Sequence, residues 1–379
     1  MIPPEPIREP QPSARAKPPA PELFEVGSAP KLGDIPFEIS LLALSTIEGL
    51  GRKGIASLFR AFKGNLSKVW DAPAAKVLAA LVEAKTPGAE GIVGAIKRGQ
   101  NRYIDNGFAT YKEFGDRNIH ILHLKDLPKP LKSIPDHPLW LFVEGEPKAL
   151  HQRPAVAVVG TRQPTKRGLD ATEQVAKLMG PYPMTLVSGL AEGIDAQAHF
   201  YSLNEGLLNV AFLGHGINSI FPAATGKIRE TIVERGGAVV TEYLPDEHYQ
   251  KKFFVERNRL QAGLADLVIP VEANPRGGTA HTIRFARTYG RPVVGIRWKG
   301  ANGLLEELER EGSTIIDIFK PGGSRQLDAM FRQLFPSLRK TYSLASLERK
   351  VMREIASRHV TATDLRKLSK AIREKLKEV

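Results

Sequence analysis

The 379-residue sequence contains no cysteine, which excludes disulfide bonds, thiolate nucleophiles and cysteine-ligated metal sites. It has no run close to the roughly 20 apolar residues that a membrane-spanning helix requires. The segment 1–22 lacks the apolar core of a signal peptide. The 9 histidines show none of the paired spacings that are typical of metal ligands. These absences predict a soluble, cytoplasmic protein that contacts no membrane and carries no metal or other cofactor.

Acidic residues are too few to balance the basic ones. The chain has 54 Lys and Arg against 41 Asp and Glu, which gives a formal net charge of +13. Such a charge favours a polyanionic partner such as nucleic acid, although a basic surface can also serve solubility alone. At 379 residues the chain is long enough for two or three domains.

Four regions of different composition divide the chain. Residues 1–36 are rich in proline and poor in large apolar residues, which predicts a disordered arm. Residues 37–115 have helical periodicity. Their Gly-Leu-Gly turn at 49–51 is typical either of a DNA-binding helix-hairpin-helix or of a plain helical hairpin. Residues 116–320 alternate between predicted strands and helices, and residues 321–379 form a basic helical tail.

Short aliphatic runs between residues 155 and 271 each end at a glycine or at a polar residue, and segments of helical length separate them. This alternation predicts an α/β fold with a mainly parallel, doubly wound sheet that is covered on both faces. The carboxyl ends of parallel strands meet at one rim, where open α/β folds bind phosphate-bearing ligands. The runs and the residues that follow them are Ala155–Val159 with Gly160-Thr161-Arg162, Thr185–Ser188 with Gly189, Asn209–Leu213 with Gly214, and Leu267–Val271 with Glu272.

The residues at these strand ends resemble a known family. Gly160–Arg162, Ser188–Asp195, Gly236–Glu242 and Arg257–Leu264 are similar in composition, order and spacing to the DNA-processing protein A (DprA/Smf) family. The resemblance is close over residues 119–318 and looser before them. It implies an extended Rossmann-like domain that binds single-stranded DNA without catalysis. It also implies a homodimer formed through this domain, which helps to load a RecA-type recombinase during DNA uptake and recombination.

The resemblance also bears on the two flanking regions. It implies that residues 37–115 form a helix-hairpin-helix or SAM-like domain. Members of the family often end in a winged-helix domain, and the basic tail at 321–379 is too short for a complete one. The tail is therefore predicted to be a degenerate or truncated winged helix.

Basic side chains, hydroxyl groups and glycine backbone at the rim are the predicted contacts to DNA. An arginine fork can donate two hydrogen bonds to one phosphate, and an aromatic ring can stack on an unpaired base. We interpret Asp195 and Glu272 as residues that orient the turns, and no residue is predicted to be catalytic. The predicted DNA- or phosphate-binding set is Gly160, Thr161, Arg162, Lys166, Ser188, Gly189, Gly193, Lys227, Lys251, Phe254, Arg257, Asn258, Arg259, Gly277, Gly278 and Thr279. For the phenylalanine, packing in the core is the alternative.

The sequence departs from the family pattern at three places. Glu192 stands where the family usually has arginine, and Val255 stands where it usually has proline. The usual Tyr-Pro-x-x-Asn is replaced by Phe-Pro-Ala-Ala-Thr at 221–225. An acid at the rim should weaken phosphate binding, so these departures leave open a role in transformation, repair or defence.

Two other functions use the same kind of rim. One is a sensor that binds a small nucleotide, and the other is an enzyme resembling the nucleotide phosphoribohydrolases. The enzyme needs a glutamate after its glycine-rich turn, whereas the segment from Pro275 to Thr282 contains none, and Glu272 lies before the glycines. A dinucleotide dehydrogenase is disfavoured because no Gly-x-Gly-x-x-Gly follows the first strand.

Overall fold

The computed structural model describes residues 34–275, 277–298 and 304–338. These residues form two compact units, one made of residues up to 125 together with 139–144, and one made of 126–138 together with the residues from 145 onward. Most of the predicted proline-rich arm and the helical patterns predicted after residue 338 lie outside the described residues. Among the described helices, none is both long enough and apolar enough to cross a membrane.

The first unit is mainly helical. Apolar side chains of α1 are buried against α5, and Gly107 of α5 permits this close approach because a Cβ there would lie 2.6 Å from the Ile39 carbonyl oxygen. The Gly-Leu-Gly segment forms the turn between α1 and α2, where Gly49 has a left-handed φ of 80°. The elements of this unit are α1 (Phe37–Ser45), α2 (Arg52–Ala61), α3 (Lys68–Asp71), α4 (Ala74–Glu83), α5 (Ala89–Asp116) and the antiparallel strands β1 (Ile119–His123) and β2 (Trp140–Gly145).

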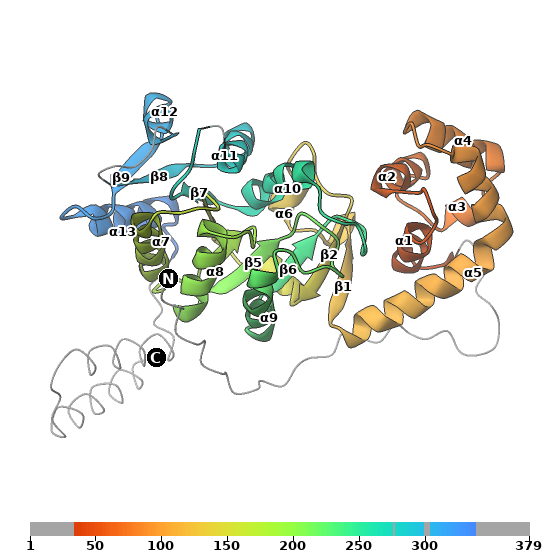
Figure 1. Ribbon diagram of the computed structural model, residues 1–379, viewed down its shortest axis with the longest axis horizontal. Helices are drawn as coiled ribbons and strands as arrows, with labels where there is room; N and C mark the ends of the chain where they lie inside the picture. Colours follow the sequence, from red (N-terminus) through yellow and green to blue (C-terminus); the bar gives the residue numbers. More distant parts are fainter. Residues whose placement is uncertain (1–33, 276, 299–303, 339–379) are drawn as a thin grey trace, which may run out of the picture. The chain divides into compact units, whose positions relative to one another are not determined.

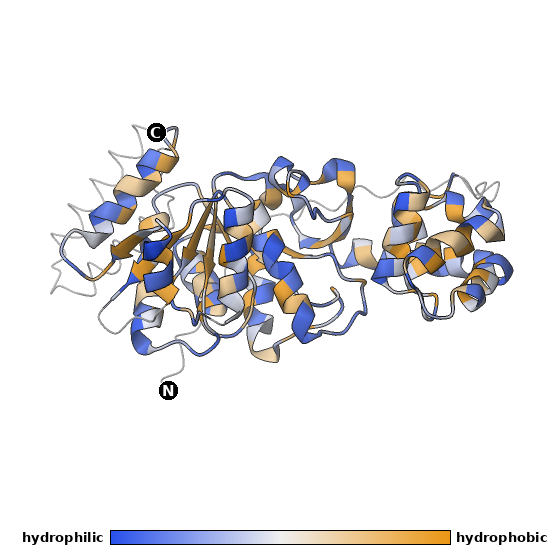
Figure 2. Cartoon of the chain, turned by 90° about the horizontal axis from the view of Figure 1, so that it is seen from above, coloured by the Kyte–Doolittle hydropathy of each residue, from blue (hydrophilic) through white to orange (hydrophobic). Residues whose placement is uncertain are grey.

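The second unit contains a parallel sheet. Five of its strands follow the order β6-β5-β4-β3-β7, and each neighbouring pair is parallel. Nearly every residue of these strands is buried, because helices cover both faces, and the strands therefore lack an alternating polar pattern. The strands are coloured as strongly hydrophobic in Figure 2. They are β3 (Ala155–Val159), β4 (Thr185–Ser188), β5 (Leu208–Phe212), β6 (Ala238–Thr241) and β7 (Leu267–Pro270).

The direction in which the chain moves across this sheet decides which face each helix covers. From β3 to β6 the chain advances strand by strand, so right-handed crossovers place the intervening helices on one face. The connection from β6 to β7 returns past β3, which places its helix on the other face. Figure 1 accordingly shows α8 and α9 on one side of the strands and α10 and α11 on the other. The helices are α7 (Lys166–Met179), α8 (Ile194–Asn204), α9 (Gly226–Glu234), α10 (Lys251–Leu264) and α11 (Gly278–Thr288).

A parallel pair of strands, β8 and β9, follows this sheet in sequence. Helix α13 packs against α7. Just after α7, the ring of Tyr182 meets Phe331 of α13 edge to face, and the Tyr182 hydroxyl donates to Asp328 at 2.6 Å. The predicted α/β fold with a mainly parallel, doubly wound sheet and an N-terminal helical region is confirmed. The remaining elements are η2 (Leu124–Asp126), α6 (Lys129–Lys132), η3 (Pro147–His151), η4 (Ala223–Thr225), β8 (Val294–Arg297), α12 (Leu304–Arg310), β9 (Thr314–Asp317) and α13 (Gly323–Leu334).

Candidate nucleic-acid interface

The loops that follow β3 and β4 lie against each other at the rim of the sheet. The backbone N–H of Ile194 donates to the Thr161 carbonyl at 3.0 Å. Gly193 has a φ of 83°, and a Cβ at this position would lie 2.3 Å from the same carbonyl oxygen. Glycine is therefore needed here both for the backbone conformation and for the contact. The first N–H of α8 is satisfied within the protein.

A buried carboxylate occupies the interior of this rim. Asp195 accepts hydrogen bonds from the backbone N–H groups of Gly160 and Gly189 and lies beside Arg257. Burial raises the pKa of Asp195, while Arg257 and the two N–H groups act in the opposite direction. Ser188 is also buried, and its hydroxyl donates to the Val158 carbonyl at 2.7 Å. The N–H groups of Gly160 and Gly189 and the hydroxyl of Ser188 thus have partners within the protein.

Glu272, at the end of β7, holds the start of α7. Its Oε2 accepts from the backbone N–H of Thr165 at 2.9 Å and from the hydroxyl of the same residue at 3.1 Å. Its backbone carbonyl accepts from Thr161 N–H at 2.6 Å. Gly168 leaves room for this arrangement, because a Cβ there would lie 1.9 Å from the carboxylate. Glu272 therefore connects the ends of β3 and β7, and its carboxylate points at the helix start.

The first arginine of the Arg-Asn-Arg block on α10 lies inside the protein. Arg257 is 2% exposed, and its guanidinium donates to the carbonyl of Gly189 at 2.6 Å and to that of Phe212. Burial lowers the pKa of Arg257 to about 10, and nearby Asp195 opposes this shift. The next residue, Asn258, is also buried and donates from its side-chain amide to the Gly278 carbonyl at 3.1 Å.

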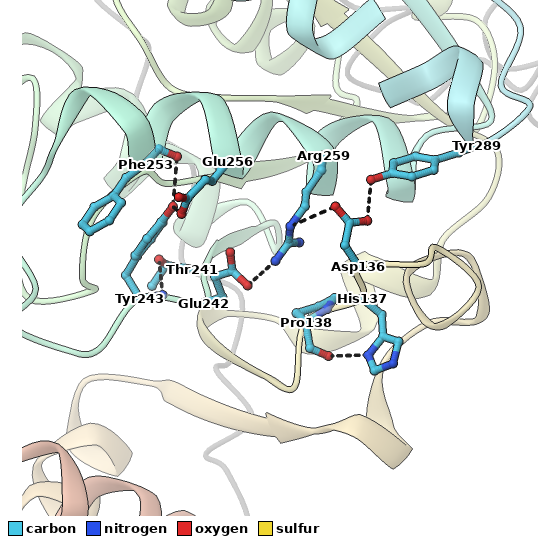
Figure 3. Close-up of polar contacts among 10 residues, drawn as sticks. All are labelled: Asp136, His137, Pro138, Thr241, Glu242, Tyr243, Phe253, Glu256, Arg259 and Tyr289. Carbon is cyan, nitrogen blue, oxygen red and sulfur yellow. Dashed lines mark hydrogen bonds and ion pairs between the residues drawn. The ribbon is translucent and has the colours of Figure 1, made fainter. Parts of the chain in front are cut away.

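The second arginine of the block belongs to an ionic network, which Figure 3 shows beneath α10. Arg259 pairs with Glu242 through Nη2, and its Nε lies 3.6 Å from an Asp136 carboxylate oxygen. Asp136 also accepts from the Tyr289 hydroxyl at 2.6 Å. Burial and this hydrogen bond raise the pKa of Tyr289 above its usual value. The network joins α10 to the end of β6, to the loop before β2 and to α11.

Consecutive residues of a helix project about 100° apart, so the three residues of the block reach three different neighbours. Arg257 reaches the ends of β4 and β5, Asn258 reaches α11, and Arg259 reaches the end of β6 and Asp136. Arg257 and Arg259, which were predicted to hold phosphates, use their guanidinium groups within the protein. Arg257 lies beside Asp195, and Arg259 pairs with Glu242 and lies near Asp136.

Arg162 is placed differently from these two arginines. It is exposed on the loop after β3, and its guanidinium lies over the Phe254 ring, 4.7 Å from the centroid. The ring is partly buried and lies against the backbone of Gly214, where a Cβ would be 2.7 Å from the ring. Cation and ring thus form an accessible unit at the ends of β3 and β5.

The other predicted contact residues are spread along the rim. Lys166 and Lys251 are exposed at the starts of α7 and α10, and Lys227 is exposed at the start of α9 with Glu230 at 3.3 Å. Glu192 is exposed beside α8. Of the glycine-rich turn before α11, Gly278 is exposed, Gly277 is partly buried and Thr279 is buried.

Two aromatic residues outside the predicted contact set lie beside Phe254. The ring centroids of Phe221 and Tyr249 are 5.9 and 6.2 Å from that of Phe254. Tyr249 precedes the Lys251-Lys252 pair by two residues, and this spacing of an aromatic residue and two cations could have drawn attention to it.

Comparison with known proteins matches residues 118–314 to the family described as DNA recombination-mediator protein A. The chain is 37% identical over 169 residues to protein Smf of Escherichia coli K12, covering 45% of each chain. It is 35% identical over 192 residues to the DNA processing protein DprA of Streptococcus pneumoniae R6, covering 50% of this chain and 67% of that protein. The chain spans about half the length of Smf from E. coli and from Synechocystis.

Two solved structures are similar to this one. The crystal structure of DprA from Streptococcus pneumoniae aligns with a TM-score of 0.54 and 27% identity, covering 74% of this chain and 94% of that one. A structure of DNA processing protein A from Helicobacter pylori, described for its single-stranded DNA binding mode, aligns with a TM-score of 0.50 and 26% identity. It covers 57% of this chain and 96% of that one. Since the family match extends over more than half of the sequence, this chain belongs to the DNA recombination-mediator protein A family.

Proposed function

We propose that this protein binds single-stranded DNA without catalysis and acts as a recombination mediator. The observation that carries the proposal is the exposed Arg162 guanidinium over the Phe254 ring at the rim of a parallel sheet. The net charge of +13 and membership of the family support it. So does the similarity to the Helicobacter pylori protein, whose structure concerns single-stranded DNA binding.

The chemistry of the rim suits an unpaired strand. The planar fork of Arg162 can donate to a phosphate, and exposed Lys166, Lys227 and Lys251 can neutralise neighbouring phosphates. The partly buried Phe254 ring can stack on a base that is not held in a duplex. Gly160, Thr161, Gly193 and the turn at 277–279 shape the floor on which the strand would lie.

The carboxylates of this rim favour binding over catalysis. Asp195 is buried and accepts two backbone N–H groups, and Glu272 is engaged by Thr165. A general base must reach the proton that it removes, whereas Asp195 is buried and Oε2 of Glu272 is engaged by Thr165. A role for these groups in orienting the rim therefore accounts for them without a reaction.

Fluorescence anisotropy with labelled oligonucleotides tests this proposal. We expect tighter binding of single-stranded than of duplex DNA, with log affinity falling against log salt by about 0.7 for each phosphate contacted. Arg162→Ala should weaken binding about ten- to a hundredfold at unchanged melting temperature, because a charge-assisted contact is lost. Arg310→Ala, which removes an exposed arginine from α12, is the matched control and should bind like the parent.

Equal affinity for duplex and single strand, or an Arg162→Ala variant that binds as well as the parent, would contradict this assignment. Competition by a mononucleotide at micromolar concentration would instead favour a nucleotide sensor. We further propose, from family membership, a cytoplasmic homodimer that helps to load a RecA-type recombinase. Light scattering at micromolar concentration tests the dimer, and recombinase filament assembly on protein-coated DNA tests the loading.

A further inference from the structure

Two loops at the rim are joined side by side by hydrogen bonds. The loop 213–222 follows β5, and the loop 242–250 follows β6. Gly216 N–H donates to the Glu247 carbonyl at 2.8 Å, and Asn218 N–H donates to the Pro245 carbonyl at 3.0 Å. The Asn218 side chain also donates to Asp246 at 2.8 Å. These contacts fix the two loops as one surface.

Buried polar side chains hold the first of these loops from below. Arg229 is 6% exposed and donates to the carbonyls of Ile217 and Ser219, each at 2.6 Å. Thr241 donates from its hydroxyl to the His215 carbonyl at 2.7 Å. The His215 ring lies 3.1 Å from the Phe221 carbonyl oxygen. The backbone that carries Phe221 is therefore held from several directions before any ligand arrives.

This arrangement places one aromatic ring from each loop face to face. Phe221 and Tyr249 are stacked with centroids 3.8 Å apart and planes 17° apart. Phe254 lies beside both rings, and Arg162 covers it. Aromatic surface and a cation thus continue from the loop after β3 to the loop after β6.

The outer part of this cluster is open to solvent. Tyr249 is 51% exposed and Ile220 is 56% exposed. Among the described residues, the other exposed large hydrophobic side chains are Val82 and Phe319. One face of the Tyr249 ring is covered by Phe221, so its exposed surface includes the other face. An exposed aromatic face on a preorganised loop is a surface that a flat ligand can cover at little entropic cost.

The charges around Tyr249 match a ligand with a phosphate backbone. Lys251 and Lys252 are exposed just after it, and Arg162 lies on the far side of Phe254. The three acids of the same loop have partners within the protein. Glu242 pairs with Arg259, Asp246 accepts from Asn218, and Glu247 accepts from Leu244 N–H at 3.0 Å. Alternating cations and open rings are what an unpaired nucleic acid strand requires.

We propose that Tyr249, supported by Phe221, is a second base-stacking site for single-stranded DNA, next to the contact formed by Arg162 and Phe254. This proposal rests on the proposed function and adds to it a residue that binds a base. The strand runs along the rim with one base against the outer face of Tyr249 and another against Phe254. Its phosphates face Arg162 and the lysine pair at 251–252.

An oligonucleotide without bases separates stacking from phosphate contact. We expect Tyr249→Ala to weaken binding of an oligothymidine about 5- to 150-fold. Binding of an abasic oligonucleotide of the same length should change by less than about twofold, because its phosphates remain. Tyr249→Phe keeps the ring and should bind both probes like the parent. Phe319→Ala removes an exposed aromatic residue elsewhere and serves as the control, and melting temperatures of all variants verify folding.

A fluorescent ring at the same position gives a second measurement. The three native tryptophans, Trp70, Trp140 and Trp298, are only 1%, 2% and 5% exposed. Tyr249→Trp therefore adds a solvent-exposed tryptophan, whose fluorescence should be quenched by oligothymidine and not by the abasic strand. Quenching by both probes alike would overturn stacking.

The outcomes distinguish this proposal from the proposed function. If the parent prefers single strands and Tyr249→Ala loses nothing with either probe, or loses equally with both, the stacking site is wrong and the binding function stands. If the parent binds neither probe, the proposed function fails and the stacking site fails with it.

Discussion

Arg162 and the two arginines of α10 belong to the same basic rim in sequence, but the structure gives them opposite environments. Arg162 lies on an exposed loop against one side of an aromatic ring. Arg257 and Arg259 end among carbonyls and carboxylates that come from distant parts of the chain. The comparison teaches that an arginine beside a predicted ligand site can either bind the ligand or hold together the strand ends that form the site.

The largest expected effect is a loss of stability on replacing the buried Arg257. Arg257→Ala would leave Asp195 buried without its nearest cation and two carbonyls without a donor. We expect a loss of about 3–5 kcal/mol in the free energy of unfolding, measured by urea denaturation. Arg257→Lys keeps the positive charge but lacks the planar guanidinium, so its free energy of unfolding should lie between those of the parent and Arg257→Ala. If Arg257→Ala unfolds like the parent but binds DNA more weakly, Arg257 contacts the ligand as Arg162 is proposed to do, and the contrast between the two arginines is wrong.

A buried histidine on α8 adds a pH dependence. Burial lowers the pKa of His199 to about 4 from 6.5, although its ring Nδ1 donates a hydrogen bond to the Asn209 side-chain oxygen at 2.8 Å. The unfolded chain therefore takes up the proton first as the pH falls. Stability from this residue is fully present above about pH 6.5 and is lost as the pH falls toward 4, by about 3 kcal/mol.

The measurement is the difference in unfolding free energy between pH 7 and pH 4.5, made on the parent and on His199→Gln. Carboxylates titrate in both proteins, so the parent should lose more stability than the variant. Equal losses would show that folding does not lower the pKa of His199.

A smaller effect is expected from the Arg259 network. Arg259→Met leaves Glu242, which is 5% exposed, without its closest cation, and should cost about 2–3 kcal/mol of stability. Adding Glu242→Gln removes the uncompensated charge and should restore part of the loss. A double-mutant cycle measured by thermal unfolding gives the coupling. Additive effects of the two changes would mean that the pair is not energetically linked.

The smallest expected effect is a change in DNA affinity on replacing the exposed Glu192. Glu192 is exposed beside the rim, and Glu192→Arg should tighten single-stranded DNA binding about two- to tenfold at low salt, with the gain fading as salt screens it. Stability should not change. Glu306→Arg on α12 is the control, because it reverses an exposed charge away from the proposed contacts and should leave affinity unchanged. If Glu192→Arg leaves affinity unchanged at every salt concentration, its side chain does not face the bound strand.

Much of the fold could be predicted from the sequence. The predicted strands at 155–159 and 185–188 agree to the residue with β3 and β4. Buried parallel strands and the glycine-rich segments that follow them can be recognised from short stretches of sequence. The same segments carried the resemblance to the family. Glycine positions at close contacts, such as 160 and 193, follow from the same local rules.

The side-chain roles at the rim could be predicted less well. Three consecutive residues of a helix project about 100° apart, and in the structure Arg257, Asn258 and Arg259 contact three different parts of the protein. The partners that decide their roles are remote: Asp136 lies 123 positions before Arg259 and Gly189 lies 68 before Arg257. Tyr249 stacks on Phe221 through loops joined by tertiary hydrogen bonds, so no local pattern places them together.

The hydrogen bonds and the ion pair made by α10 have a consequence for how the rim moves. One turn of this helix holds the ends of β4, β5 and β6 and the start of α11. Displacing that turn would break all of these contacts in a single event, so the amide protons around the rim should exchange with solvent as one cooperative group.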